Sequence, residues 1–161
     1  MTEVIPYSVF VSHSTKQDDL AIINAACNDA LLRGITCYIA ERDWQFGKPL
    51  PEKIDKAIRS CDCFVVFLTQ GGTQSAWVHQ EIGFARACGK LRIMVVEHGV
   101  KVQGFDVDKE YIHLDRSDPS DAITKLNTYL SGLQLAKAAA LRNGALLVLS
   151  ILGLLLLKGG E

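Results

Sequence analysis

Hydrophobic positions along the chain switch repeatedly between strand-like runs and helix-like spacings. Five short apolar runs predict strands, because each is rich in β-branched or aromatic residues and lies between turn signals. They cover residues 8–12, 35–40, 63–69, 92–96 and 111–114. The run 63–69 (CFVVFLT) is continuously apolar, which is typical of a strand covered on both faces.

The segments that separate these strands predict helices, which begin at capping or first-turn residues. These residues are Thr15 with Asp18, Pro51, Ser75, and Asp118 with Pro119. Arg33-Gly34 and Gly89 supply stop signals for the first and third helices. Apolar residues three or four apart predict the buried faces: Leu20, Ile23, Cys27 and Leu31 in the first helix, Ile54, Ile58 and Cys61 in the second, and Ile123, Leu126 and Leu130 in the fourth.

Alternating strands and helices indicate an α/β domain with a parallel sheet covered on both faces. Right-handed crossovers with short connections favour a flavodoxin-like strand order, 2-1-3-4-5. Ligands of such sheets bind at the carboxyl ends of the strands, beside the first and third strands. The loops expected there are 12–16, 41–49 and 70–75.

The C-terminal part of the sequence has a different character. Residues 143–157 (NGALLVLSILGLLLL) carry no charge and would span roughly 22 Å as a helix, short of a hydrocarbon core of roughly 30 Å. Residues 138–141 extend the stretch if Arg142 snorkels. We therefore predict a domain over residues 1–133 and an apolar helix over 134–161 that anchors the chain to a membrane. The fourth helix either runs straight into this tail or breaks at Gly132. An apolar tail that packs in an oligomer, or lies on the bilayer surface, is the alternative.

Composition and charge narrow the class of protein. The chain has 161 residues, of which 48% are hydrophobic, and this is enough for one domain with a core. Its 17 basic and 18 acidic residues give a net charge of −1, so nucleic acid is not an expected partner. No signal peptide is recognisable at the start. Five irregularly spaced cysteines and the basic flank of the tail predict a cytoplasmic domain, and the spacing Cys61-x-Cys63 does not predict a metal site.

Standard catalytic and phosphate-binding motifs are missing from the sequence. What remains is the segment 75–81 (SAWVHQE), at the start of the helix that follows the third strand. Trp77 and Glu81 are four residues apart, so they share one helical face at the expected cleft. The alternative is a surface glutamate one turn after a packed tryptophan.

Three motifs in order give the chain a wider resemblance. They are residues 9–14 (VFVSHS), residues 43–49 (DWQFGKP), and residues 75–82 (SAWVHQEI) followed by 87–90 (ACGK). Over residues 9–133 the chain resembles a Toll/interleukin-1 receptor (TIR) domain, of the microbial type that cleaves NAD⁺. The third motif is also similar to the corresponding helix of NAD-cleaving animal TIR domains.

The resemblance implies that Glu81 is the carboxylate required to cleave the nicotinamide–ribose bond of NAD⁺. NAD⁺ is then the substrate, and no cofactor or metal is expected. Nicotinamide leaves as a neutral molecule, so the enzyme mainly has to stabilise the positive charge that develops on the ribose. Capture by water gives ADP-ribose and internal capture gives cyclic ADP-ribose; Trp77 would favour the second by excluding water.

Further site residues and partners follow from the same resemblance. The residues expected to contact the substrate, besides Trp77, are Ser12, His13, Ser14, Ser75, Asp43 and Trp44. Asp43 and Trp44 either close over the dinucleotide or contact a neighbouring subunit. Self-association through TIR domains, a downstream effector or other TIR protein, and a role in antiviral defence or NAD depletion are also implied. Two alternatives stay open: a non-enzymatic scaffold that acts through TIR–TIR assembly, and an enzyme like the nucleoside deoxyribosyltransferases.

Overall fold

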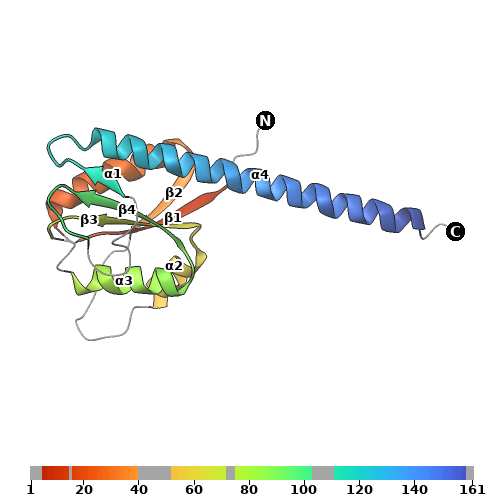
Figure 1. Ribbon diagram of the computed structural model, residues 1–161, viewed down its shortest axis with the longest axis horizontal. Helices are drawn as coiled ribbons and strands as arrows, with labels where there is room; N and C mark the ends of the chain where they lie inside the picture. The colour runs from red at the N-terminus through yellow and green to blue at the C-terminus, as the bar shows by residue number, and fades with distance from the viewer. Residues whose placement is uncertain (1–4, 15, 40–51, 72–74, 103–110, 159–161) are drawn as a thin grey trace.

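A five-stranded parallel sheet forms the centre of the domain. The computed structural model describes residues 5–14, 16–39, 52–71, 75–102 and 111–158, with side chains as far as residue 145 (Figure 1). The strands are β1 (Tyr7–Ser12), β2 (Ile35–Ile39), β3 (Cys63–Leu68), β4 (Leu91–Glu97) and β5 (Ile112–Leu114). Their order, β2-β1-β3-β4-β5, confirms the predicted flavodoxin-like topology.

Four helices cover the two faces of this sheet. Helices α1 (Gln17–Leu32) and α4 (Ser120–Lys158) lie on one face, and α2 (Glu52–Ser60) and α3 (Ala76–Ala87) on the other (Figure 1). Each face has its own apolar core, and every residue of β3 is buried, as its sequence predicts. On the α2/α3 face, the rings of Phe10 and Phe64 stack with their centroids 5.5 Å apart.

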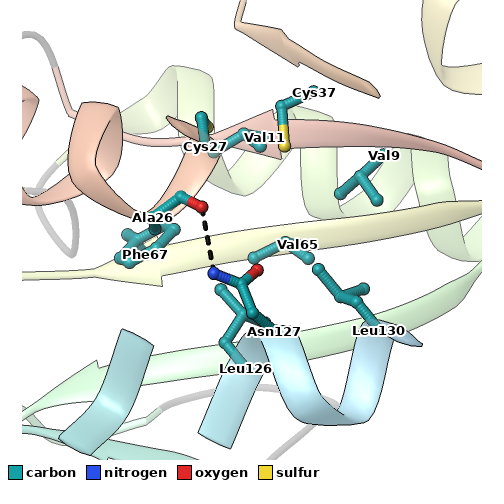
Figure 2. Close-up of a pocket in the computed structure, with 10 residues that line it drawn as sticks. All are labelled: Val9, Val11, Ala26, Cys27, Cys37, Val65, Phe67, Leu126, Asn127 and Leu130. Atoms are coloured by element: carbon teal, nitrogen blue, oxygen red, sulfur yellow. Dashed lines mark hydrogen bonds between the residues drawn. The ribbon is translucent and has the colours of Figure 1, made fainter. Parts of the chain in front are cut away.

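The core under α1 and α4 contains a small cavity of about 10 Å³, room for one water molecule at most (Figure 2). Its lining is apolar apart from Asn127 and the thiols of Cys27 and Cys37. Asn127 Nδ2 donates a hydrogen bond of 3.1 Å to the carbonyl oxygen of Ala26, which ties α4 to α1. The cavity is therefore a gap in the core and too small for a nucleotide.

Helix α1 buries a face that overlaps only in part with the predicted one: Ile23 is buried and Cys27 packs against the core, but Leu31 does not. Leu31 is 63% exposed, whereas Ile22, Ile23, Ala26 and Ala30 are buried. Small alanines let the helix approach α4 and the sheet closely, so the contact face carries little hydrophobic signal in the sequence. The helix begins after Lys16, with no side-chain cap at that residue, and Thr15 of the predicted capping box lies outside the described residues.

The other helix signals agree better with the structure. Ser75 Oγ accepts a hydrogen bond of 3.4 Å from the Val78 amide and so caps α3, as predicted. Gly34 and Gly89 follow α1 and α3 with φ of 77° and 66°, a left-handed conformation that suits glycine. Ile54, Ile58 and Cys61 are buried at and just after α2.

Helix α4 is one continuous element of 39 residues, without a break at Gly132. It passes the amino ends of the strands and projects from the domain (Figure 1). Gln134 Nε2 donates to the carbonyl oxygens of Ile5 and Gly34, and Lys137 Nζ donates to that of Pro6. Of the two predicted alternatives, the fourth helix runs straight into the tail, and the predicted boundary after residue 133 falls inside this helix, where Gln134 and Lys137 contact the domain.

The predicted membrane span has no support in the structure. Within the residues whose side chains are described, no helix combines the length and the apolar character needed to cross a membrane.

Candidate functional site

The carboxylate of Glu81 is completely buried between α3 and the sheet. Ser75 caps α3, and Glu81 lies in the second turn of that helix with 0% exposure. Its Oε2 accepts a short hydrogen bond from Oγ of Ser12, the last residue of β1. The alternative of a surface glutamate is therefore wrong, because the side chain faces the carboxyl end of β1.

Trp77 lies one turn before Glu81 on the same face of α3, as the spacing predicts. It is 3% exposed and belongs to the apolar cluster that contains Phe10 and Phe64. The indole therefore packs in the core on the side of the sheet that carries Glu81. His79 lies on another face of α3 and is exposed.

The three polar residues at the end of β1 are all buried and face different neighbours. Ser12 contacts Glu81 on the α3 side, whereas Ser14 Oγ donates a short hydrogen bond to Asp19 Oδ2 in the first turn of α1. The ring nitrogen Nδ1 of His13 contacts the carbonyl oxygen of Ser14. Residues 12–14 are consequently fixed from both faces of the sheet.

Two of the three predicted loops come together at the carboxyl edge. Thr69, directly after β3, donates from Oγ1 to Asp19 Oδ2 over 2.7 Å. The side chain of Lys16 lies so close to Gly71 that a Cβ at residue 71 would meet its Cδ at 2.6 Å. The third loop, with Asp43 and Trp44, lies outside the described residues.

A charged cluster at this edge escapes prediction from the sequence. Arg116, which follows β5, donates from Nη2 to Asp19 Oδ1 over 2.6 Å. It also donates from Nε to Glu97 Oε1 over 2.6 Å and from Nη2 to Glu97 Oε2 over 3.1 Å. We call Asp19, Glu97 and Arg116 the carboxyl-edge cluster. Asp19 and Arg116 are 97 positions apart, so no local spacing could signal their contact.

The hydrogen bonds of the carboxyl-edge cluster favour its charged state. Burial alone would raise the pKa of Asp19, but hydrogen bonds from Ser14, Arg116 and Thr69 lower it below its usual value. The pKa of Glu97 is lowered chiefly by its hydrogen bond from Arg116, against the opposing effect of burial. Both carboxylates raise the pKa of Arg116, so its guanidinium stays charged.

Resident metal ions have no ligand set in the part of the chain that the structure describes. No group of three or more histidine, cysteine, aspartate or glutamate side chains is placed there to hold one. The carboxylate of Asp19 at the carboxyl edge instead accepts hydrogen bonds from hydroxyl and guanidinium groups.

Comparison with protein families decides the identity of the domain. A model of the TIR domain matches residues 9–127, which is most of the chain. The chain belongs to the TIR domain family. The match begins within β1 and ends within α4, so it includes both Ser12 and Glu81.

Solved structures share the fold of this TIR domain at low sequence identity. The CMP N-glycosidase BcmB from Clostridium botulinum is 20% identical, with a TM-score of 0.56 over 76% of this chain and 98% of that chain. The TIR domain of the Toll-related receptor TRR-2 from Hydra magnipapillata is 18% identical, with a TM-score of 0.55 over 66% and 83%.

A third solved structure with this fold has an even lower sequence identity. A diflavin flavoprotein from Nostoc sp. is 10% identical, with a TM-score of 0.53 over 83% of this chain and 99% of that chain. At such identities the likeness concerns the fold alone. The curated proteins searched contain no match to this TIR domain.

Proposed function

We propose that this TIR domain cleaves the nicotinamide–ribose bond of NAD⁺, with Glu81 as the catalytic carboxylate. The observation that carries the proposal is the burial of Glu81 and its hydrogen bond from Ser12 at the carboxyl end of β1. Ligands of parallel α/β sheets bind at this edge. A buried carboxylate is costly unless it is hydrogen-bonded, and such groups are often retained for chemistry.

The reaction suits a single carboxylate. When the C–N bond breaks, its electron pair goes to nicotinamide, which leaves neutral, and positive charge develops on the ribose as in glycoside cleavage. Glu81 would stabilise that charge and hold the ribose hydroxyls. Water then adds to the ribose carbon and loses a proton, giving ADP-ribose; a nucleophile within the same molecule gives cyclic ADP-ribose and also releases a proton.

We assign the remaining predicted contacts to the same site. Ser12 would orient Glu81, and Trp77 would form an apolar wall beside it. His13, Ser14 and Ser75 would line the nucleotide side, with Asp43 and Trp44 contributed by the loop after β2. The fold is compatible with such chemistry, since the CMP N-glycosidase with a similar structure is named for cleavage of an N-glycosidic bond.

We further propose that the domain self-associates and that the distal part of α4 attaches it to a membrane. The uncharged sequence of residues 143–157 supports this attachment. Gln134 and Lys137 contact the domain, so a shortened chain should end after Arg142 and not after residue 133.

The test is nicotinamide release from NAD⁺ by the full chain, compared with Glu81→Gln and Glu52→Gln. Glu52 is exposed in the first turn of α2, on a different helix from Glu81, and gives the same chemical change. We expect Glu81→Gln to lower the rate at least about 100-fold, as loss of a charge-stabilising group does, and Glu52→Gln to leave it unchanged.

Parallel assays separate the alternatives. Release of cytosine from CMP, with none of nicotinamide from NAD⁺, would indicate a nucleotide N-glycosidase. If neither base is released at high protein concentration on vesicles, while light scattering shows assembly, the chain is a scaffold and the proposal is wrong.

A further inference from the structure

The carboxyl-edge cluster joins the ends of four strands, β1, β3, β4 and β5, to the first turn of α1. Asp19 is 2% exposed and accepts hydrogen bonds from Ser14, Thr69 and Arg116. Glu97, the last residue of β4, accepts two from Arg116 and one of 3.0 Å from the amide of Gln70. The loops after β1 and β3 are therefore held by the same three charged side chains.

Its charge indicates what the cluster does. Two carboxylates face one guanidinium, so the anionic diphosphate of a dinucleotide would meet an excess of negative charge. The guanidinium is also oriented by its fork of hydrogen bonds to both carboxylates. Arg116 is thus better suited to hold protein groups in place than to bind the substrate.

The route from the cluster to Glu81 is short. Ser14 is held by Asp19, and Ser12, two residues earlier in the same strand end, donates to Glu81. A shift of Ser14 toward α1 or away from it would move Ser12 with it, because the two residues are separated only by His13. Positional errors of about 1 Å at a reacting group can lower rates by about 100-fold.

We propose that Asp19 and Arg116 are positioning residues that fix the Ser12–Glu81 contact through the loop after β1. This inference rests on the proposed function, since it concerns the geometry of the same carboxylate. It predicts an effect on kcat with little effect on KM, because the cluster does not touch the substrate.

The experiment compares Asp19→Asn with Asp62→Asn in the full chain. Asp62 accepts hydrogen bonds from the amide and hydroxyl of Ser8 and from Lys137 Nζ, so it holds the other end of β1. Both variants lose a charged anchor of the same strand and should lose stability. Steady-state kinetics are measured well below the unfolding temperature of each variant.

We expect Asp19→Asn to lower kcat about 10- to 100-fold with KM within about threefold, and Asp62→Asn to leave both nearly unchanged. Arg116→Lys keeps the positive charge but loses the guanidinium geometry that lets one side chain donate to both carboxylates, so it should also lower kcat. Equal kcat in Asp19→Asn and the wild type would overturn the positioning role while leaving the proposed function intact.

Amide hydrogen exchange gives a reading that does not depend on activity. Exchange of the amides of residues 12–16 should become faster in Asp19→Asn and stay unchanged in Asp62→Asn. Unchanged exchange in Asp19→Asn would overturn the inference even in a chain that proves inactive. A wild-type chain that releases no nicotinamide would overturn the proposed function, and with it the catalytic part of this inference.

Discussion

The hydroxyl of Ser12 donates a hydrogen bond to the carboxylate of Glu81, 69 positions later in the chain, and both side chains are fully buried. The contact joins the first strand of the domain to the helix after the third strand. A buried carboxylate depends on such donors for both its charge and its orientation.

Substitution of Ser12 tests the importance of this contact. We expect Ser12→Ala to lower kcat for nicotinamide release about 10-fold or more, because a donor to a buried charged group is worth about 1.5–3 kcal/mol. Ser8→Ala is the matched control, since it makes the same change at the other end of β1, where Ser8 contacts Asp62. Equal losses in the two variants would show that the strand as a whole, and not the Ser12–Glu81 contact, sets the rate.

The anchorage of α4 to the amino end of the sheet contributes to stability. Lys137 Nζ lies 2.8 Å from Asp62 Oδ1 and 5.8 Å from the centre of the Tyr7 ring. We expect Lys137→Ala to reduce the free energy of unfolding by about 1 kcal/mol, as measured by urea denaturation.

An exposed ion pair on the same helix provides the control. Lys125 and Asp121 form an i,i+4 pair with side chains 63% and 66% exposed. Lys125→Ala should therefore change the free energy of unfolding by less than about 0.5 kcal/mol. A larger loss from Lys125→Ala than from Lys137→Ala would contradict the importance of the Lys137 contacts.

Acid should destabilise the domain through three carboxylates. The pKa values of Asp19, Glu97 and Asp62 are lowered in the folded protein; for Asp62, hydrogen bonds from Lys137 and Ser8 outweigh the opposing effect of burial. When the pH is below the ordinary pKa values of these carboxyl groups, the unfolded chain binds more protons than the folded chain does. The free energy of unfolding should thus be constant above about pH 5 and fall as the pH drops below about 4.

Urea denaturation between pH 3 and pH 7 checks this dependence. Asp62→Asn removes one contributing group, so the variant should lose less stability than the wild type over the same drop in pH. Parallel curves for the two proteins would show that Asp62 does not contribute to acid sensitivity.

Two neighbouring thiols should differ in reactivity. Cys27 and Cys37 line the same small core cavity (Figure 2), and the interaction of the two thiols raises the pKa of Cys27 and lowers that of Cys37. Thiolates are the reactive form, so iodoacetamide should label Cys37 before Cys27, as mass spectrometry of the peptides would show. Cys63 is buried, and burial raises its pKa to about 12, so it should react more slowly than Cys37. Faster labelling of Cys27 than of Cys37 would contradict this order of the two pKa values.

Local patterns explain which parts of the fold the sequence predicts. The strands, the cap at Ser75 and the stops at Gly34 and Gly89 each depend on a few neighbouring residues, and all are present in the structure. The buried face of α1 is predicted only in part: Ile23 is buried, but other contact residues are small alanines, whereas Leu31 is exposed.

In the candidate site too, features that depend on neighbouring residues are predictable from the sequence, whereas contacts between distant residues are not. The shared face of Trp77 and Glu81 follows from helical spacing, and the resemblance to TIR domains singles out Glu81. The partners of Asp19 are residues 14, 69 and 116, which the topology of the sheet brings together. A contact of that kind becomes visible only when the strands are placed side by side.

The length and direction of α4 have a mechanical consequence. Its 39 residues form a helix about 58 Å long, which leaves the domain at the amino edge of the sheet, whereas Ser12 and Glu81 meet at the opposite, carboxyl edge. A continuous rod transmits orientation as well as distance, unlike a flexible tether. A partner that binds the far end of α4 therefore also fixes the orientation of the carboxyl edge of the sheet. Neighbouring copies bound in the same way would present their carboxyl edges, with Glu81, in a common direction.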